Sequence, residues 1–241
     1  MDGKKVVVIT GASRGIGRAC AIGFAGLGYQ TVLIARDKQK LEEVANEIQN
    51  SPEFKNSPEP LLWFFDIAEK EKINSVINAV VEKFGRIDVL VNNAGIYYRG
   101  TSSLPLEKFE QQLAINLTAA FSFVKAVIPV MKKQKHGYIF NIASRSGKVG
   151  FAESGGYSAS KFGLVGLTGS LVRELSEYGI SATAICPGWV DTEMAYDAGT
   201  PLKASEMIQP SDIFKTMEWL LGLSPAARVK EVMIESSKSI H

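Results

Sequence analysis

The sequence VVVITGASRGIG, residues 6–17, places a short run of β-branched residues directly before three glycines and the start of a helical pattern. The apolar run predicts a buried strand, and the pattern after Gly15 predicts a helix. The glycines between them allow a tight turn and a close approach of the backbone. This order of strand, glycine loop and helix is how a doubly wound α/β fold begins.

The glycine loop also predicts a ligand. The first turn of a helix has unpaired N–H groups and the positive end of the helix dipole, which together suit a pyrophosphate. The spacing is Gly-x-x-x-Gly-x-Gly, unlike the commonest dinucleotide fingerprint, and no Gly-Lys-Ser/Thr follows as a P-loop requires. We therefore predict a dinucleotide phosphate site, with an ordinary helix-opening turn as the alternative. Its residues are Gly11, Ser13, Arg14, Gly15, Ile16 and Gly17.

The rest of the chain alternates between short β-branched runs and longer amphipathic stretches. This alternation is typical of a parallel sheet that helices cover on both faces. We expect a single NAD(P)-binding domain over residues 1–241, an α/β doubly wound Rossmann-type fold with about seven parallel strands. The expected strands are 5–10, 31–35, 61–65, 89–92, 138–142, 181–185 and 231–234, and the expected helices are 15–28, 37–49, 70–84, 106–132, 157–178 and 211–221. Glycines at 28, 85 and 179 suit left-handed helix ends.

The composition is that of an ordinary globular protein, with 46% hydrophobic residues, 22% charged residues and a net charge of +2. Acidic and basic residues are mixed, so we expect no nucleic acid and no membrane as partners. Cys20 and Cys186 lie far apart, which predicts no disulfide and a reducing compartment. With His136 and His241 they match no metal-site spacing, so no metal is expected. Since no run resembles a signal peptide or a membrane span, we expect a soluble, cytoplasmic protein.

Two stretches lack a periodic pattern. Residues 186–210 follow a predicted strand and contain Pro187, Gly188, Gly199 and Pro201. Loops this long are uncommon in compact domains and often close over an active site, so we predict a substrate lid. Residues 51–60 contain three prolines and predict an exposed connector.

The end of the second predicted strand bears on the choice of cofactor. NAD-binding folds place an acidic residue there to bind the ribose 2′-hydroxyl. This chain has Ala35 at that point, followed by Arg36, and Arg14 lies in the glycine loop. Two arginines suit a 2′-phosphate through charge-assisted hydrogen bonds. Asp37 argues slightly for NAD, but its place before a helix suits an N-cap. We therefore predict NADP(H).

Tyr157 and Lys161 are four residues apart, so one helical turn stacks them on the same face. A fixed ammonium beside a phenol favours the phenolate, so we expect the pKa of Tyr157 to fall towards neutral. Such a tyrosine can serve as a general acid and base. In a chain with seven tyrosines a Tyr-x-x-x-Lys pair could arise by chance. The catalytic interpretation of this pair therefore depends on the other motifs in the chain.

Together these motifs resemble the short-chain dehydrogenase/reductase family over nearly the whole chain. Further motifs match the family in order and separation. They are Asp66 after the third strand, Asn92-Asn93-Ala94-Gly95, Ile115-Asn116-Leu117, Ser144, and the Pro187-Gly188-x-Val190-x-Thr192 run.

The resemblance implies hydride transfer between a nicotinamide and a carbonyl or secondary alcohol carbon, with no metal. It implies that Tyr157 exchanges the proton and that Ser144 hydrogen-bonds the same oxygen. Lys161 would lower the pKa of Tyr157 and hold the nicotinamide ribose, and Asn116 would anchor a water that relays protons to Lys161. The remaining cofactor contacts implied are Asp66 and Ile67 at the adenine, Asn93, Ala94 and Gly95 beside the cofactor, and Pro187, Gly188, Val190 and Thr192 at the nicotinamide.

Two other functions stay open. A 3-oxoacyl-acyl-carrier-protein reductase has the same chemistry, but many such enzymes carry Asp-Gly-Gly after the last strand. This chain has Glu231-Val232-Met233-Ile234-Glu235 there, which is more similar to general carbonyl and 3-hydroxy-acid reductases. The other alternative is a non-catalytic, dinucleotide-sensing regulator; such proteins often lose the tyrosine or the lysine, and this chain keeps both.

The predicted substrate pocket is apolar and partly aromatic, with basic residues that either select an anionic substrate or lie at a solvated rim. Its candidates are Tyr97, Tyr98, Arg99, Arg145, Lys148, Phe151, Glu153, Trp189, Met194 and Tyr196. Gly163, Gly166 and Gly169 on the helix of Tyr157 allow a close helix approach. Since relatives pair this helix across a two-fold axis, we expect a homodimer or homotetramer, with packing inside the monomer as the alternative.

Overall fold

The computed structural model describes residues 3–54 and 57–239, so part of the predicted connector and His241 lie outside it. Within these residues seven strands form one parallel sheet in the order β3-β2-β1-β4-β5-β6-β7. The predicted doubly wound α/β fold is confirmed. The strands are β1 Val6–Thr10, β2 Gln30–Ala35, β3 Leu61–Phe64, β4 Val89–Asn92, β5 Gly137–Ile142, β6 Ile180–Pro187 and β7 Glu231–Ile234.

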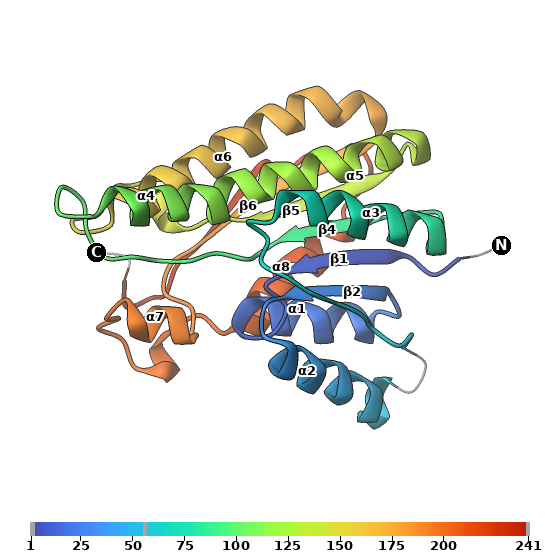
Figure 1. Cartoon of the computed structure of the whole chain (residues 1–241), viewed down its shortest axis with the longest axis horizontal. Helices are drawn as coiled ribbons and strands as arrows, with labels where there is room; N and C mark the ends of the chain where they lie inside the picture. Colours follow the sequence, from blue (N-terminus) through green and yellow to red (C-terminus); the bar gives the residue numbers. More distant parts are fainter. Residues whose placement is uncertain (1–2, 55–56, 240–241) are drawn as a thin grey trace.

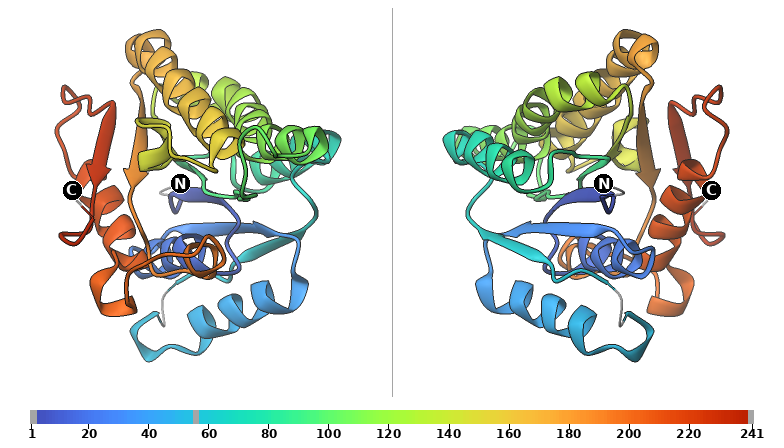
Figure 2. Two further views of the ribbon diagram at one scale, coloured as in Figure 1. Left: turned by 90° about the vertical axis from the view of Figure 1, so that its left-hand side faces the viewer. Right: turned by 90° about the vertical axis from the view of Figure 1, so that its right-hand side faces the viewer.

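Helices cover both faces of the sheet (Figures 1 and 2). One layer holds α3 Lys70–Phe84, α4 Leu106–Leu113, α5 Ala120–Gln134 and α6 Gly155–Leu175; the other holds α1 Gly15–Gly26, α2 Lys38–Asn50 and α8 Pro210–Leu221. Strand β1 shows why residues 6–9 are all apolar. Val6 and Val8 belong to the core under the first layer, and Val7 and Ile9 to the core under the second. Since successive side chains point to opposite faces, a strand buried on both sides needs no polar residue.

Helix ends follow the predicted signals. Gly28, Gly85 and Gly179 have φ of 77°, 71° and 71°, which confirms the left-handed helix ends. Asp37 is the N-cap of α2, where its carboxylate accepts a hydrogen bond from the Lys40 N–H at 3.0 Å. The two cysteines are fully buried, as expected of packing residues: Cys20 in α1 and Cys186 in β6.

The predicted helix 106–132 is continuous but not uniform. Between α4 and α5 lies a π-helical turn, Ala114–Ala119. The whole run Leu106–Gln134 has an apolar window of mean hydropathy 1.8 and is long enough to cross a membrane. The expectation that no stretch reaches that length is therefore wrong. The run packs on the sheet through Phe123, Val127 and Met131, and this packing accounts for its apolar face.

Residues 186–210 are more ordered than a loop. Strand β6 continues to Pro187, and a short helix, α7 Glu193–Asp197, and a 3₁₀ turn, Ala204–Glu206, follow. A bridge between Val190 and Ile208 closes the base of this segment. In Figure 1, α7 lies beyond the carboxyl ends of the strands. We call residues 186–210 the lid segment.

Candidate active site

A pocket of about 870 Å³ lies at the carboxyl ends of the central strands. The glycine loop forms one wall, the segments after β4 and β5 form the floor, and the lid segment lies opposite. The strand order reverses between β1 and β4, and doubly wound sheets bind ligands at that point. Every residue predicted for the cofactor or for catalysis lines this pocket except Gly17 and Asn116.

Gly17 and Asn116 lie just behind the wall. A Cβ at Gly17 would sit 2.1 Å from the Gly11 carbonyl oxygen, so Gly17 lets α1 pack against the loop. Asn116 is 1% exposed and lies under Gly95. A Cβ at Gly95 would be 3.3 Å from Asn116 Oδ1 and 3.6 Å from Lys161 Nζ, so both head groups lie next to that glycine.

The glycine loop is a preformed cradle. Gly11 has φ of +65°, and a Cβ there would lie 2.9 Å from Ala94 Cα. Asn93 Nδ2 holds the loop by donating to the Thr10 and Gly11 carbonyls at 2.9 and 3.1 Å. No side chain caps the N-terminus of α1, so its first N–H groups face the pocket without a side-chain acceptor. This backbone fits a dinucleotide pyrophosphate.

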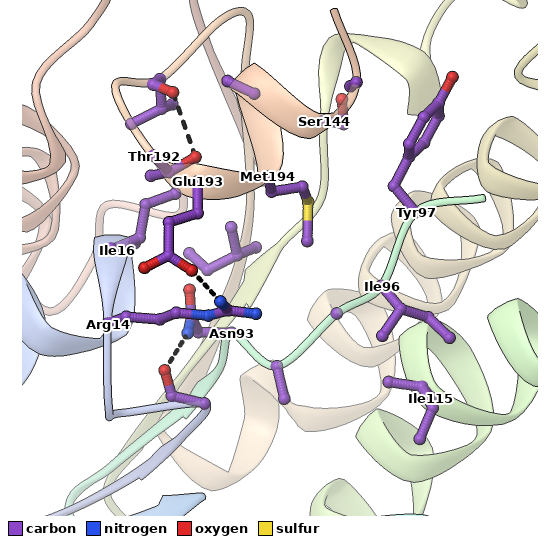
Figure 3. Close-up of a pocket in the computed structure, with 18 of the residues that line it drawn as sticks. Arg14, Ile16, Asn93, Ile96, Tyr97, Ile115, Ser144, Thr192, Glu193 and Met194 are labelled. Carbon is purple, nitrogen blue, oxygen red and sulfur yellow. Dashed lines mark hydrogen bonds and ion pairs between the residues drawn. The ribbon is translucent and has the colours of Figure 1, made fainter. Parts of the chain in front are cut away.

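The adenosine end of the pocket contains the predicted cations, and each is paired with a carboxylate. Arg36 Nη1 lies 3.2 Å from Asp66 Oδ2. Arg14 pairs with Glu193 of the lid segment (Figure 3). Lys40 Nζ lies 3.4 Å from the same carboxylate. The sequence reasoning missed Lys40 and Glu193, because only the folded chain brings α2, the glycine loop and α7 together.

Tyr157 and Lys161 lie on the first turns of α6, on one side of the helix as predicted. Lys161 is 3% exposed, and its Nζ donates to the Ile142 carbonyl at 2.7 Å. Burial lowers the pKa of Lys161 from 10.5 to about 8. Burial also raises the pKa of the Tyr157 phenol to about 12, and a hydrogen bond with Ser144 opposes this only in part.

The expectation that the pKa of Tyr157 falls towards neutral is therefore wrong for this structure. Lys161 Nζ lies 5.5 Å from the centre of the Tyr157 ring and is hydrogen-bonded to backbone. At that distance its charge does not overcome the cost of burying a phenolate.

Asn116 is held by three hydrogen bonds inside the π-helical turn. Its Oδ1 accepts from the Ile96 N–H at 2.8 Å, and its Nδ2 donates to the Ile96 carbonyl at 2.9 Å and to Ser160 Oγ at 3.0 Å. Asn116 therefore ties the segment after β4 to α6, between Tyr157 and Lys161. Single-turn π bulges of this kind are frequent at functional sites.

The predicted substrate residues divide into two groups. Six of them line the pocket: Tyr97, Arg145, Phe151, Trp189, Met194 and Tyr196. Arg145 stacks on Phe151 at 4.8 Å and also pairs with Glu235 at 3.3 Å. The other four lie outside: Arg99 pairs with Glu153, Lys148 Nζ lies 2.9 Å from Glu231, and Lys108 lies over the Tyr98 ring. Sequence reasoning missed several further lining residues: Ile96, Ile115, Ile142, Ala143, Ser146 and Ser154.

Comparison with known proteins agrees with this geometry. The family model for short chain dehydrogenase matches residues 5–202. A 3-oxoacyl-[acyl-carrier-protein] reductase of Synechocystis is 35% identical over 92% of this chain and 91% of its own. The crystal structure of a betaketoacyl-[ACP] reductase from Bacteroides thetaiotaomicron is 44% identical, with a TM-score of 0.87 over 99% of both chains. An alcohol dehydrogenase from Thermococcus sibiricus, complexed with 5-hydroxy-NADP, is 30% identical, with a TM-score of 0.88 over 99% of both chains.

The matched region includes the glycine loop, Ser144, Tyr157, Lys161 and the start of the lid segment, all of which meet in one pocket. The chain is an oxidoreductase and belongs to the short-chain dehydrogenase/reductase family.

Proposed function

We propose that this protein is an NADP(H)-dependent carbonyl reductase, or an alcohol dehydrogenase in the reverse direction, with Tyr157 as the general acid and base. The observation that carries the proposal is that Ser144, Tyr157 and Lys161 line the same pocket as the glycine cradle. A substrate oxygen bound there lies beside the phenol, while the dinucleotide lies along the cradle.

The nicotinamide, when bound, supplies or accepts the hydride. In reduction, Tyr157 gives its proton to the carbonyl oxygen; the raised pKa keeps the phenol protonated and ready as an acid at neutral pH. The Ser144 hydroxyl donates a hydrogen bond to the same oxygen and orients the carbonyl. Lys161 is positioned to hold the nicotinamide ribose and to favour the phenolate once Tyr157 has given up its proton. Asn116 holds the floor under Gly95, close to Lys161, and is proposed to anchor the relay water nearby.

NADP(H) is the proposed cofactor. Ala35 stands where NAD-binding folds carry an acid, and Arg14, Arg36 and Lys40 line that end of the pocket. The complex of the Thermococcus sibiricus relative with 5-hydroxy-NADP supports the same choice. We expect Arg36→Asp to shift the ratio of kcat/KM values from NADP towards NAD; an unchanged ratio would show that Arg36 does not read the 2′-phosphate.

The lid segment is proposed to cover the substrate. Trp189, Met194 and Tyr196 project from it to line the pocket opposite Tyr97 and Phe151. These side chains favour an apolar or aromatic substrate over a highly charged one.

The test of the mechanism is Tyr157→Phe. We expect turnover to fall by at least about a thousandfold, because the phenol is the proton donor, while NADPH binding stays within about twofold of wild type. Steady-state assays measure turnover, and a fluorescence titration with NADPH measures cofactor binding separately. Turnover close to wild type in this variant would overturn the mechanism, and retained cofactor binding with no turnover on any carbonyl in the wild type would favour a dinucleotide-sensing regulator.

A second candidate is a 3-oxoacyl-acyl-carrier-protein reductase. It is favoured by the betaketoacyl-[ACP] reductase from Bacteroides thetaiotaomicron, which has the highest identity of the structures compared above. A panel of 3-oxoacyl thioesters, simple ketones and aldehydes, followed by loss of NADPH absorbance, separates the two candidates by their kcat/KM values.

A further inference from the structure

Glu193 joins three segments that are far apart in the sequence. It is the first residue of α7 in the lid segment, and its carboxylate pairs with Arg14 of the glycine loop (Figure 3). The same carboxylate also pairs with Lys40 of α2. All three residues line the adenosine end of the pocket. The carboxylate therefore occupies the same two cations that a phosphate on the adenosine 2′ position would use.

These ion pairs are suited to exchange. The side chains of Arg14 and Glu193 are 59% and 55% exposed, and exposed pairs contribute little to stability. The two cations also lower the pKa of Glu193, so its carboxylate is ionised throughout the neutral range. A dianionic phosphate is a stronger acceptor for a guanidinium than a single carboxylate.

The rest of the lid segment is anchored independently. The Ile208 N–H donates to the Trp189 carbonyl at 3.0 Å, and the Asp191 N–H donates to the Ile208 carbonyl at 2.9 Å. At the far end, Ser236 Oγ donates to the Glu206 carbonyl at 2.6 Å. Loss of the Glu193 contacts would therefore remove the ion pairs between α7, which carries Met194 and Tyr196, and the glycine loop and α2, without detaching the base of the segment.

We infer that Glu193 is a latch that holds α7 to the glycine loop and that a 2′-phosphate on the bound nucleotide releases. The inference rests on the proposed NADP(H) dependence and adds that the same phosphate controls the helix over the substrate. Glu193 competes with the phosphate for Arg14 and Lys40, so it weakens nucleotide binding while it restrains the lid. A nucleotide without the phosphate leaves the latch closed.

Adenine nucleotides without nicotinamide test the latch apart from catalysis. We expect Glu193→Gln to bind 2′,5′-ADP about three- to fivefold more tightly than wild type, and to bind 5′-ADP within about twofold of wild type. Glu47→Gln is the matched control, because Glu47 of α2 pairs with Arg18 of α1 at 2.6 Å, is similarly exposed, and lies outside the pocket. It should change neither affinity. Isothermal titration calorimetry gives all six values.

Hydrogen exchange reports the lid directly. In wild type, the amides of residues 198–200, which donate to carbonyls of α7, should exchange slowly without nucleotide and faster with saturating 2′,5′-ADP, but not with 5′-ADP. In Glu193→Gln they should exchange fast in every state. If wild type binds both nucleotides equally, the NADP preference fails and the latch fails with it. If wild type prefers 2′,5′-ADP but Glu193→Gln changes neither binding nor exchange, the latch alone is overturned and the proposed cofactor stands.

Discussion

At the scale of single residues, the site is built around a lysine that the fold holds at a cost. Lys161 is buried with one backbone acceptor, and desolvation lowers its pKa from 10.5 to about 8. At neutral pH the folded chain holds the Lys161 ammonium in a buried site, whereas in the unfolded chain water solvates the same charge. A shift of this size corresponds to roughly 3 kcal/mol.

Replacing that lysine should separate stability from activity. We expect Lys161→Met to lose turnover yet to raise the free energy of unfolding at pH 7 by about 1 kcal/mol, since the relief of desolvation exceeds the lost hydrogen bond to Ile142. Between pH 8 and 10.5 the folded lysine is neutral while the unfolded one is still protonated, so wild-type stability rises with pH. This changes the stability difference by about 2 kcal/mol, so at pH 10 the variant should be less stable than wild type by about 1 kcal/mol. Urea unfolding at both pH values measures this, and an equal difference at both would contradict it.

The sequence predicted which side chains form the site better than it predicted their charge states. Tyr157, Lys161 and Ser144 could be found because helix spacing and family motifs locate them. The pKa of Tyr157 could not, because it depends on how deeply the phenol is buried and on the direction of the Lys161 side chain, whose ammonium donates to the Ile142 carbonyl of β5. Glu193 was missed because its ion-pair partners, Arg14 and Lys40, lie 179 and 153 residues away in the sequence.

At the scale of elements, helix ends differ in how well their residues suit them. Helix α5 ends at Lys135, which has φ of 54°, whereas α3 ends at Gly85 with φ of 71°. A left-handed backbone is easy for glycine and strained for lysine. Both helices thus end in a left-handed residue, which is the unfavourable Lys135 in α5 and the favourable Gly85 in α3.

Exchanging these end residues should have opposite effects. We expect Lys135→Gly to raise the free energy of unfolding by about 0.5–1 kcal/mol and Gly85→Ala to lower it by about 1 kcal/mol. A Cβ at Gly85 would meet nothing within 4 Å. The loss of stability in Gly85→Ala would therefore reflect backbone strain alone. Thermal denaturation measures both, with turnover as the control that the site is unaffected. A change of the same sign in both variants would refute the assignment of strain.

Most of the helices and strands were predictable from local signals in the sequence. Helix α3 was predicted to the residue, because its periodicity and the glycine that ends it are both local signals. The π-helical turn inside the predicted helix 106–132 was not, because the bonds from Asn116 to Ile96 and Ser160 that accompany it are tertiary.

At the scale of the whole molecule, one outer face lacks a partner in the monomer. Phe121 of α5 and Phe162 of α6 are 48% and 45% exposed, and a Cβ at Gly166 would meet nothing within 4 Å. Gly163 is different, since its Cβ would lie 2.7 Å from Leu117 Cδ2 and its smallness serves packing inside the monomer. The predicted homo-oligomer thus stays a proposal, with α5 and α6 as its face.

A single charge on that face should test the assembly. We expect the wild-type protein to be a dimer or tetramer and Phe162→Glu to dissociate it at this interface, because an unpaired carboxylate would be buried there. Light scattering coupled to size-exclusion chromatography gives the masses. Leu27→Glu, at an equally exposed apolar residue after α1, should leave the mass unchanged. A monomeric wild type would refute the proposal.

The burial of both thiols has a practical consequence. Cys20 and Cys186 are inaccessible, and burial raises their pKa values to about 12 and about 11, so neither forms a thiolate readily in the native chain. A thiol reagent should react only with molecules in which local or global unfolding has exposed a cysteine. The labelling rate then reports how often such unfolding occurs. The chain can also carry a cysteine introduced on the surface of α7 and be labelled there alone, which would let a fluorophore follow that helix in real time.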